Sequence, residues 1–281
     1  MNRINDLLDP IISNVLKNQQ RHDTDYIGED GLIRCGECGE PRQCRITVCD
    51  EERVVPCTCA CDKKRIAADE ERKRAEDTER RRRDTFPLES DRRETFAADD
   101  SPESIPSRAA RSYAESFDPD KSDTLIMHGG TGTGKTTLAK FIANRVIDRG
   151  YTVWFTSISE IECRLWPTGD REGVYSRIRN TDLLVLDDFG FERRTEYMND
   201  IVYSVINARY VTGKPMIITT NLEARELIKG ADINTSRVLS RIDENAVPLL
   251  VEGEDRRLTK LKLTGADKLN RLLAYGTDGG R

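Results

Sequence analysis

Five short apolar runs after residue 123 constrain the fold of this chain more than any other feature. Polar residues do not alternate through these runs, which is typical of strands buried on both faces of a parallel sheet. The runs are TLIMH (124–128), TVWFT (152–156), LLVLD (183–187), MIITT (216–220) and VPLLV (247–251). Helical patterns lie between them: Leu138, Ile142 and Val146 share one helix face, and Gly150 ends that segment. We therefore predict an α/β fold in which helices cover both faces of a parallel five-stranded sheet.

The composition limits the class of protein. The chain has 281 residues, of which 37% are hydrophobic and 34% charged, and its formal net charge is -5. Its apolar residues concentrate after residue 123, which favours one main domain with a smaller one attached. No apolar run reaches the roughly 20 residues that span a bilayer, and the N-terminus lacks a signal-peptide pattern. We therefore expect a cytoplasmic protein without a membrane partner, and local basic patches leave nucleic acid open as a partner.

A phosphate-binding loop follows the first apolar run directly. The stretch GGTGTGKT (129–136) matches G-x-x-x-x-G-K-[ST] and precedes an amphipathic helical pattern. Its glycines let backbone N–H groups face phosphate oxygens at a helix N-terminus. Lys135 is expected to reach the β- and γ-phosphates, and Thr136 to hold Mg²⁺. The predicted nucleotide contacts are Gly129, Gly130, Thr131, Gly132, Thr133, Gly134, Lys135, Thr136 and Thr137.

Two further strand ends carry polar residues that suit ATP hydrolysis. Asp187 and Asp188 end the third apolar run, and Asn221 follows the fourth. Because the carboxyl ends of parallel strands meet at one sheet edge, these side chains are expected beside the phosphate loop. Asp187 would hold Mg²⁺, Asp188 would polarise the attacking water, and Asn221 would orient that water. Asn221 is also compatible with a simple turn.

Three longer stretches resemble the DnaC/IstB-type branch of the AAA+ ATPases. The main one is DLLVLDDFGFERRTEYMNDIVYSVINARYVTGKPMIITTNL (182–222), with an Asp–Asp pair, an NARY helix end and a KP…TTN strand. RETFAADDSPESIPSRAARSYAESF (93–117) is similar to the segment that leads into that ATPase core. SRVLSRIDENAVPLLVEGEDRR (236–257) is similar to its C-terminal box. The resemblance covers roughly residues 93–263.

The resemblance implies an AAA+ fold whose ATP lies between neighbouring subunits of a homo-oligomer. By position, Arg241 would be the arginine finger offered to the next subunit, with Arg237 as the alternative. Arg257 would be the sensor that contacts the ATP of its own subunit, and the adjacent Arg256 is the alternative for this role. Family members often carry Ser-Tyr before the last arginine, where this chain has Asp255 and Arg256.

Seven of the eight cysteines lie between positions 35 and 61. Cys35-x-x-Cys38-Gly is the turn that presents two thiolates to zinc. Two more ligands are expected from CTCAC (57–61), where alternate residues of an extended chain share a face. We predict Cys35, Cys38, Cys57 and Cys59 as the zinc ligands, with Cys61 as an alternative to either of the last two. Zinc is favoured over an iron–sulfur cluster, and Cys44 and Cys49 are left as bystanders.

These patterns predict four segments. Residues 1–66 would form an N-terminal zinc-binding, helicase-interacting domain, and 67–92 a charged helical linker. Residues 93–270 would form the AAA+ ATPase domain, and 271–281 a flexible tail. The amphipathic stretch INDLLDPIISNVLK (4–17) suits either a helix that packs on its own domain or one that docks on a partner.

Helicase loaders of the DnaC and DnaI kind, bacterial or phage, resemble the whole layout, including a small zinc domain ahead of the ATPase. This implies an ATP-dependent loader that brings a hexameric DnaB-type replicative helicase onto single-stranded DNA, with ATP, Mg²⁺ and Zn²⁺ as cofactors. Candidate bases for the DNA are Arg164, Arg193 and Arg194. The alternatives are an IstB-like transposition helper ATPase acting on duplex DNA, and a zinc adaptor that binds ATP only as a switch.

Overall fold

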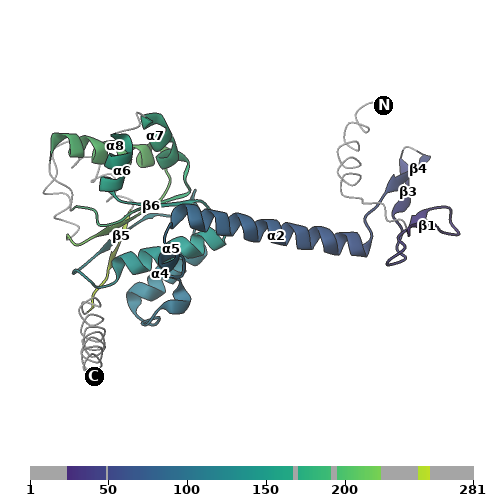
Figure 1. Cartoon of the computed structure of the whole chain (residues 1–281), viewed down its shortest axis with the longest axis horizontal. Helices are drawn as coiled ribbons and strands as arrows, with labels where there is room; N and C mark the ends of the chain where they lie inside the picture. Colours follow the sequence, from purple (N-terminus) through teal and green to yellow (C-terminus); the bar gives the residue numbers. More distant parts are fainter. Residues whose placement is uncertain (1–23, 49, 167–169, 191–194, 223–245, 254–281) are drawn as a thin grey trace, which may run out of the picture. The chain divides into compact units, whose positions relative to one another are not determined.

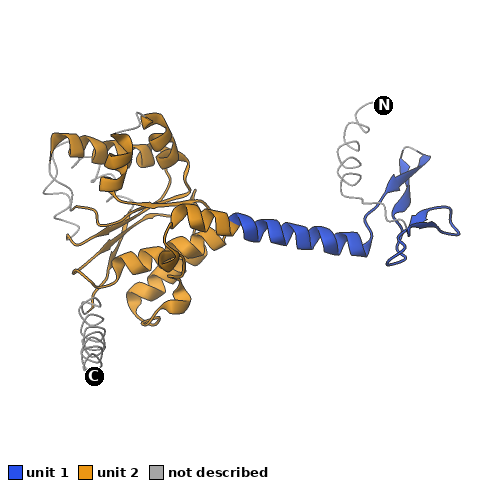
Figure 2. Ribbon diagram, viewed as in Figure 1, with its two compact units in different colours: residues 1–77 blue, residues 78–281 orange. Residues whose placement is uncertain are grey.

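The computed structural model of the chain describes residues 24–48, 50–166, 170–190, 195–222 and 246–253. The chain divides into two compact units, residues 1–77 and 78–281 (Figure 2). Helix α2, Ala60–Thr85, contributes residues to both units. Within the described ranges, no helix combines the length and the apolar character needed to span a lipid bilayer.

The first unit consists of two small antiparallel hairpins and the beginning of α2. Strand β1 (Tyr26–Ile27) pairs with β2 (Ile33–Arg34), and β3 (Gln43–Val48) pairs with β4 (Glu51–Pro56). Among the described residues of this unit, the buried ones are Cys35, Arg42, Cys59 and Asp62. Two thiols and an ion pair therefore lie where a larger domain would have an apolar core.

The second unit is built on a five-stranded parallel sheet. In the order β6-β7-β8-β5-β9, its strands are Val153–Thr156, Leu183–Leu186, Met216–Thr220, Thr124–His128 and Ala246–Leu250. Every neighbouring pair is parallel. The chain order changes direction at β5, which has β8 on one side and β9 on the other. Ligands bind open α/β sheets at the carboxyl ends of the strands beside such a point.

Helices cover both faces of this sheet (Figure 1). On one face lie α6 (Ile158–Leu165), α7 (Arg171–Asn180) and α8 (Glu196–Thr212). On the other lie α4 (Ile105–Ser116) and α5 (Lys135–Asp148), and the short helices α3 (Glu89–Arg92) and η1 (Phe96–Ala98) precede them. Alternate residues of β7 feed two separate cores: Leu184 and Leu186 pack with α6–α8, whereas Leu183 and Val185 pack with α4 and α5.

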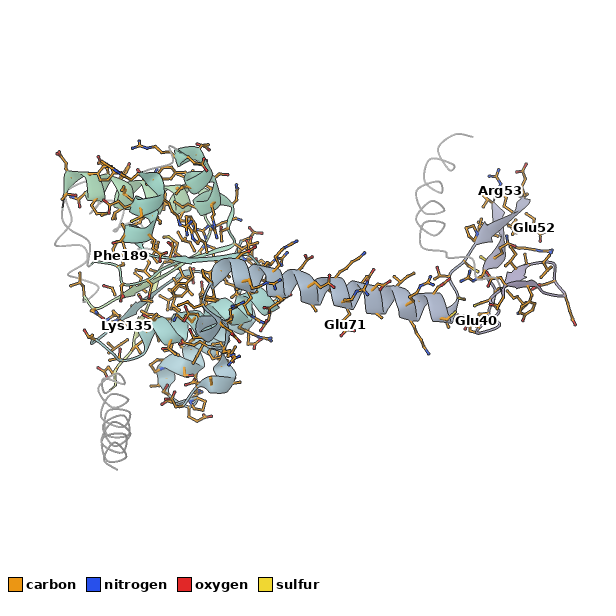
Figure 3. All side chains as sticks on the ribbon, in the orientation of Figure 1. Glu40, Glu52, Arg53, Glu71, Lys135 and Phe189 are labelled. Carbon is orange, nitrogen blue, oxygen red and sulfur yellow. The ribbon has the colours of Figure 1, made fainter. Side chains whose placement is uncertain are left out.

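The structure confirms the predicted α/β class and places all five strands within one residue of the apolar runs. The face formed by Leu138, Ile142 and Val146 is buried, as expected. The predicted linker 67–92 is helical in α2 up to Thr85 and again in α3. The side chains of α2 stand out into solvent around the labelled Glu71 (Figure 3). The predicted domain limits stay predictions, and α2 runs through the expected boundary at residue 66. The amphipathic stretch 4–17 and the tail 271–281 lie outside the described residues.

Candidate functional site

The phosphate loop joins β5 to α5 and is shaped by glycines with positive φ. Gly129 has φ +142, and a Cβ there would collide with the carbonyl oxygen of Val251, just after β9. Gly134 has φ +101 and forms the N-cap of α5. Since side chains avoid such backbone angles, glycine is needed at both ends of the loop. The loop therefore lies close to the sheet and leaves the N–H groups at the start of α5 for a ligand.

Lys135 holds its charge inside this loop. Its side chain is buried, and its Nζ donates hydrogen bonds to the carbonyl oxygens of Gly129 (2.9 Å) and Gly130 (2.7 Å). Lys135, at the start of α5, and Phe189, after β7, mark the same sheet edge in Figure 3. An ammonium group in this position adds positive charge to a helix N-terminus, which is the electrostatic requirement of a phosphate site.

The acid pair lies at the end of β7. The hydroxyl groups of Thr136 (3.0 Å) and Thr219 (2.6 Å) both donate to Oδ1 of Asp187. Burial raises the pKa of Asp187 and outweighs these two hydrogen bonds, which lower it. Asp188 has φ +54, and its N–H donates to the Thr219 hydroxyl (2.9 Å). A half-buried carboxylate beside two hydroxyls is a donor set that suits Mg²⁺.

Thr219 was not singled out from the sequence. It occupies the fourth position of MIITT in β8, the strand next to β7, and it links the two acids through its hydroxyl. A signal was present, because a hydroxyl near the carboxyl end of a buried strand faces the same edge as the acid pair. Sequence alone does not give the order of the strands. That order places β8, which carries Thr219, next to β7, which ends at the acid pair.

A cavity of about 310 Å³ brings most of the predicted residues together. The phosphate loop lines it from one side, and Asp188 and Asn221 line it from the ends of β7 and β8. The lining residues are Glu94, Ala98, Asp100, Thr131, Gly132, Gly134, Lys135, Thr136, Thr137, Phe141, Asp188 and Asn221. Gly129, Gly130 and Thr133 belong to the loop but not to this lining.

The remaining wall of the cavity comes from the segment before α4. Glu94, Ala98 and Asp100 contribute to it, and no role was assigned to them from the sequence. Asn144 of α5 is fully buried and donates from Nδ2 to the carbonyl oxygens of Asp91 (3.0 Å) and Glu94 (2.7 Å). The helix that begins at the phosphate loop thus also holds the opposite wall of the cavity.

The predicted arginine residues fall almost entirely outside the described ranges. This applies to the finger candidates Arg237 and Arg241, to the sensor candidates Arg256 and Arg257, and to the DNA candidates Arg193 and Arg194. Arg164 is described and lies exposed on α6. The roles of these arginines stay predictions.

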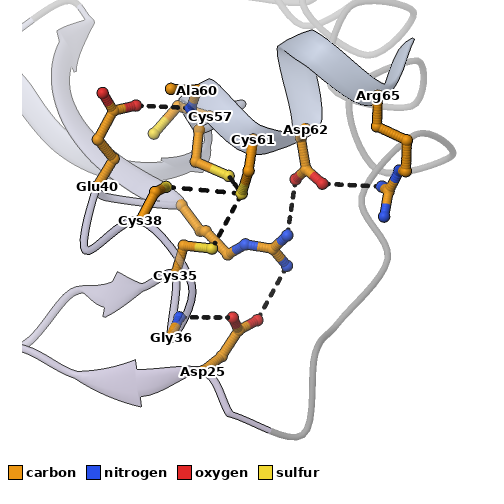
Figure 4. Close-up of polar contacts among 12 residues, drawn as sticks. Asp25, Cys35, Gly36, Cys38, Glu40, Cys57, Ala60, Cys61, Asp62 and Arg65 are labelled. Carbon is orange, nitrogen blue, oxygen red and sulfur yellow. Dashed lines mark hydrogen bonds and ion pairs between the residues drawn. The ribbon is translucent and has the colours of Figure 1, made fainter. Parts of the chain in front are cut away.

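A second cluster of functional groups lies in the first unit. The sulfur atoms of Cys35, Cys38, Cys59 and Cys61 all lie within 4.8 Å of one another (Figure 4). Cys61 Sγ is 3.3 Å from Cys35, 3.1 Å from Cys59 and 3.6 Å from Cys38. Four sulfurs around a tetrahedral zinc ion at about 2.3 Å lie about 3.8 Å apart. The thiols are therefore grouped as a zinc ion requires, with small adjustments.

The grouped thiols differ from the predicted ligand set at one position. Cys57 lies outside the four-thiol group, and its thiol instead donates to the carbonyl oxygen of Pro41 (3.2 Å), whereas Cys61 lies inside it. The expectation assumed an extended chain through residue 61, in which successive side chains point to opposite faces. In the structure α2 begins at Ala60, so Cys61 lies in a helix and this alternation no longer applies. Burial and the neighbouring Cys44 raise the pKa of Cys57 to about 11, so this thiol stays protonated at neutral pH.

Cys35 is prepared to act as a thiolate. Burial opposes ionisation, but the backbone N–H groups of Cys38 and Glu37 point at its sulfur and lower its pKa to about 6. Thiolates are the soft ligands that zinc prefers. Cys49 lies outside the described residues.

Comparison with known proteins places this site in a family. A family model described as IstB-like ATP binding protein matches residues 75–264. The replicative helicase loader DnaC of Escherichia coli (strain K12) is 30% identical over 125 residues, which cover 43% of this chain and 51% of DnaC. The replicative helicase loader DnaI of Bacillus subtilis (strain 168) is 25% identical over 150 residues, 49% of this chain and 48% of DnaI.

A protein named as an ATP-binding protein in an insertion sequence of Mycobacterium tuberculosis is 34% identical over 105 residues, which cover 36% of this chain and 42% of that protein. The chain thus spans about half the length of the curated relatives it matches, or less.

Two solved structures share the fold. The crystal structure of the DnaC helicase loader has a TM-score of 0.52 and 24% identity, and the match covers 59% of this chain and 100% of that one. The crystal structure of DnaI also has a TM-score of 0.52, with 22% identity, and the match covers 60% of this chain and 93% of that one. The α/β unit described above therefore has the fold of these AAA+ structures. Because the matched residues 75–264 are more than half of the chain and include the phosphate loop, the acid pair and Asn221, this chain belongs to the family of IstB-like ATP-binding proteins.

Proposed function

We propose that this chain hydrolyses ATP and uses the cycle to load a hexameric DnaB-type replicative helicase onto single-stranded DNA. The observation that carries the enzymatic part is the single cavity lined by Lys135, Asp188 and Asn221. The similarity to the helicase loaders DnaC and DnaI supports the loading role.

The ATP reaction would use residues that line the cavity together with Asp187, which accepts a hydrogen bond from Thr136 of that lining. The loop N–H groups and Lys135 would bind the β- and γ-phosphates, with the ammonium group turning from the loop carbonyls to the phosphate oxygens. Thr136 and Asp187 would hold Mg²⁺, which neutralises charge on the phosphates. Asp188 would accept the proton of a water that Asn221 orients, so that the water attacks the γ-phosphorus and ADP leaves.

Completion of the site by a second copy is part of the proposal. Arg241, with Arg237 as the alternative, would reach the γ-phosphate of the neighbouring subunit, and Arg257 would contact the ATP of its own subunit. Both functions follow from the family resemblance. They make hydrolysis dependent on assembly, because an arginine supplied from outside stabilises transition-state charge.

The first unit would be the helicase-binding module, folded around zinc held by Cys35, Cys38, Cys59 and Cys61. The grouping of the four thiols supports the metal site. A structural zinc ion can stabilise a unit that lacks an apolar core. Its role toward the helicase comes from the resemblance to the loaders.

The alternative function is that of a transposition helper that acts on duplex DNA. The similarity to the insertion-sequence protein of Mycobacterium tuberculosis supports it, since the identity of 34% is comparable with the 30% to DnaC. The cysteine cluster ahead of the ATPase unit favours the loader, because transposition helpers that resemble this ATPase usually lack one.

The test is helicase loading onto circular single-stranded DNA, which has no end for a ring to thread. The assay measures displacement of an annealed strand by the DnaB-type helicase of the same host, with and without this chain, ATP and Mg²⁺. We expect displacement only with all components, and a loss of at least 10²-fold in ATP turnover for Asp188→Asn, with ATP binding retained.

Two results would contradict the proposal. If the helicase is not loaded and duplex DNA, rather than single-stranded DNA, stimulates ATP turnover, the transposition helper becomes the better function. If wild type and Asp188→Asn both bind ATP without turnover in the presence of DNA and helicase, the chain is a nucleotide-dependent switch and not an ATPase.

A further inference from the structure

A buried arginine lies directly beside the cysteine cluster. Arg42, on the loop that enters β3, is only 2% exposed. Its Nη1 donates to Asp25 (2.9 Å) and its Nη2 to Asp62 (2.7 Å), and Asp62 is itself 1% exposed. Figure 4 shows the labelled Asp25 and Asp62 each joined by a dashed line to the same guanidinium group. A buried charge in so small a unit needs a specific reason, because removing it from water is unfavourable.

The backbone of Arg42 is also joined to the cysteine segment. Its carbonyl oxygen accepts a hydrogen bond from the N–H of Cys57 (2.8 Å), and its guanidinium group reaches Asp62, the residue that follows Cys61. The guanidinium group is charged, because arginine stays protonated in proteins. Four thiolates around a divalent cation leave a net negative charge, and an adjacent cation with N–H donors offsets that charge and orients the sulfur.

Arg42 is also joined to the first turn of α2 through Asp62. Asp62 lies in the first turn of α2, next to Cys61, and it additionally accepts from Arg65 (2.8 Å). From the turn after Cys38, Glu40 accepts the backbone N–H of Ala60 (2.6 Å). The first helical turn is thus attached at two points to the segment that follows Cys38. One of these attachments, through Asp62, depends on Arg42.

We propose that Arg42 is the positioning residue of the cysteine site: it offsets the charge of the metal-bound thiolates and, through Asp62, fixes the helical turn that presents Cys61. This inference rests on the proposed zinc site. A planar guanidinium group can bridge Asp25 and Asp62 through two separate nitrogens, whereas a lysine ammonium group is a point charge that cannot hold both carboxylates in this geometry.

The experiment measures zinc release from the full-length protein into an excess of a chromophoric chelator. Variants Arg42→Lys, Arg42→Met and Asp62→Asn are compared with wild type and with the control Arg45→Met. Arg45 lies in β3, close to Arg42 in sequence, but is exposed and contacts the carbonyl oxygen of Asp30. We expect release at least tenfold faster for Arg42→Met. Arg42→Lys and Asp62→Asn should be intermediate, and Arg45→Met should match wild type.

A second readout separates positioning from folding. Each variant is loaded with Co²⁺, whose absorption reports a tetrahedral set of thiolates. We expect the spectrum to survive in Arg42→Lys and Asp62→Asn while release becomes faster. Wild-type release rates in both of these variants would overturn the inference, even if Arg42→Met fails to fold. Zinc-free wild-type protein would overturn the zinc proposal together with this inference, whereas zinc-bound wild type with unchanged release in every variant would overturn the inference alone.

Discussion

At the residue scale, the nucleotide site depends on a steric constraint at Gly129 and an electrostatic one at Asp187. Gly129 lies so close to the carbonyl oxygen of Val251 that only a hydrogen fits in place of a side chain. Asp187 carries a carboxylate in a position where burial favours its neutral form. The buried carboxylate of Asp187 reduces the stability of the protein without ligand, as is usual for functional sites.

The steric constraint predicts different outcomes for two adjacent glycines. Gly129→Ala should lower the free energy of unfolding by about 3 kcal/mol, because its Cβ collides with backbone and its φ of +142 disfavours a side chain. Gly130→Ala is the matched control, since its Cβ would meet only Thr133 Cγ2 at an ordinary 3.6 Å. Denaturant unfolding without nucleotide measures both. Equal stability of the two variants would mean that the loop does not lie against β9.

The electrostatic constraint predicts that Asp187→Asn stabilises the nucleotide-free protein. Because the folded pKa of Asp187 is raised above 3.8, the native state binds its proton more tightly than the unfolded state, and stability falls as pH rises through the window just above 3.8. The amide oxygen can still accept from Thr136 and Thr219. We expect a melting temperature a few degrees higher at pH 7, and loss of the further stabilisation that Mg²⁺ and ATP give wild type.

Asp182 is the control, because its pKa is shifted in the opposite direction from that of Asp187. Burial raises its pKa, but the N–H and hydroxyl groups of Thr152 and the ammonium group of Lys214 outweigh burial and lower it. Its contribution is therefore present above pH 3.8 and lost as pH falls through the lowered value. Asp182→Asn should lower the melting temperature at pH 7 and leave Mg²⁺ dependence unchanged. If both variants shift in the same direction, the assigned electrostatics of Asp187 are wrong.

At the scale of elements, α5 organises the site. Its first turn carries Lys135 and Thr136, and its third carries Asn144, which holds the segment of Asp91 and Glu94 against the cavity. Lys140 of the same helix forms an ion pair with Asp91 (2.8 Å). One helix thus connects the phosphate end of the cavity with its opposite wall.

This arrangement predicts that Asn144 affects nucleotide binding from outside the cavity. Asn144→Ala should lower the free energy of unfolding by about 1–3 kcal/mol, because two half-buried carbonyl groups lose the side-chain amide that donates to them. It should also weaken ATP binding, since the wall formed by Glu94 and Ala98 loosens. Asn180→Ala is the control: Asn180 is exposed, and its side-chain amide donates to the Ser176 hydroxyl. Isothermal titration with a non-hydrolysable ATP analogue distinguishes the two, and unchanged affinity in Asn144→Ala would contradict the prediction.

The elements also show what sequence can and cannot predict. Apolar runs gave the strands, and the spacing of glycines and lysine gave the phosphate loop, because both depend on local periodicity or on one turn. Thr219 and Glu94 were missed because their roles arise from strand order and from a long-range contact with α5. Cys57 was preferred over Cys61 because the sequence does not mark where β-type alternation ends and α2 begins.

At the scale of the whole molecule, the two units derive their stability from different sources. The second unit has two apolar cores, one on each face of its sheet. In the described part of the first unit, by contrast, the buried side chains are two cysteines, Arg42 and Asp62. Such a unit buries too little apolar surface to offset the conformational entropy that it loses on folding. It needs a further source of stability, such as a bound metal ion. The two units should therefore respond differently to removal of metal.

Calorimetry with and without a zinc chelator tests this difference. If zinc binds the four thiols as proposed, the chelator, or the double change Cys35→Ser/Cys38→Ser, should remove the unfolding transition of the first unit, because a unit without an apolar core loses its fold with its metal. The transition of the second unit should keep its melting temperature and should still rise with Mg²⁺ and ATP, since its cores contain no metal ligand. Cys163→Ser, a change at an exposed cysteine of the second unit, should leave the response to chelator unchanged. A single transition that the chelator shifts as a whole would mean that the units fold as one body, in which zinc also stabilises the ATPase sheet.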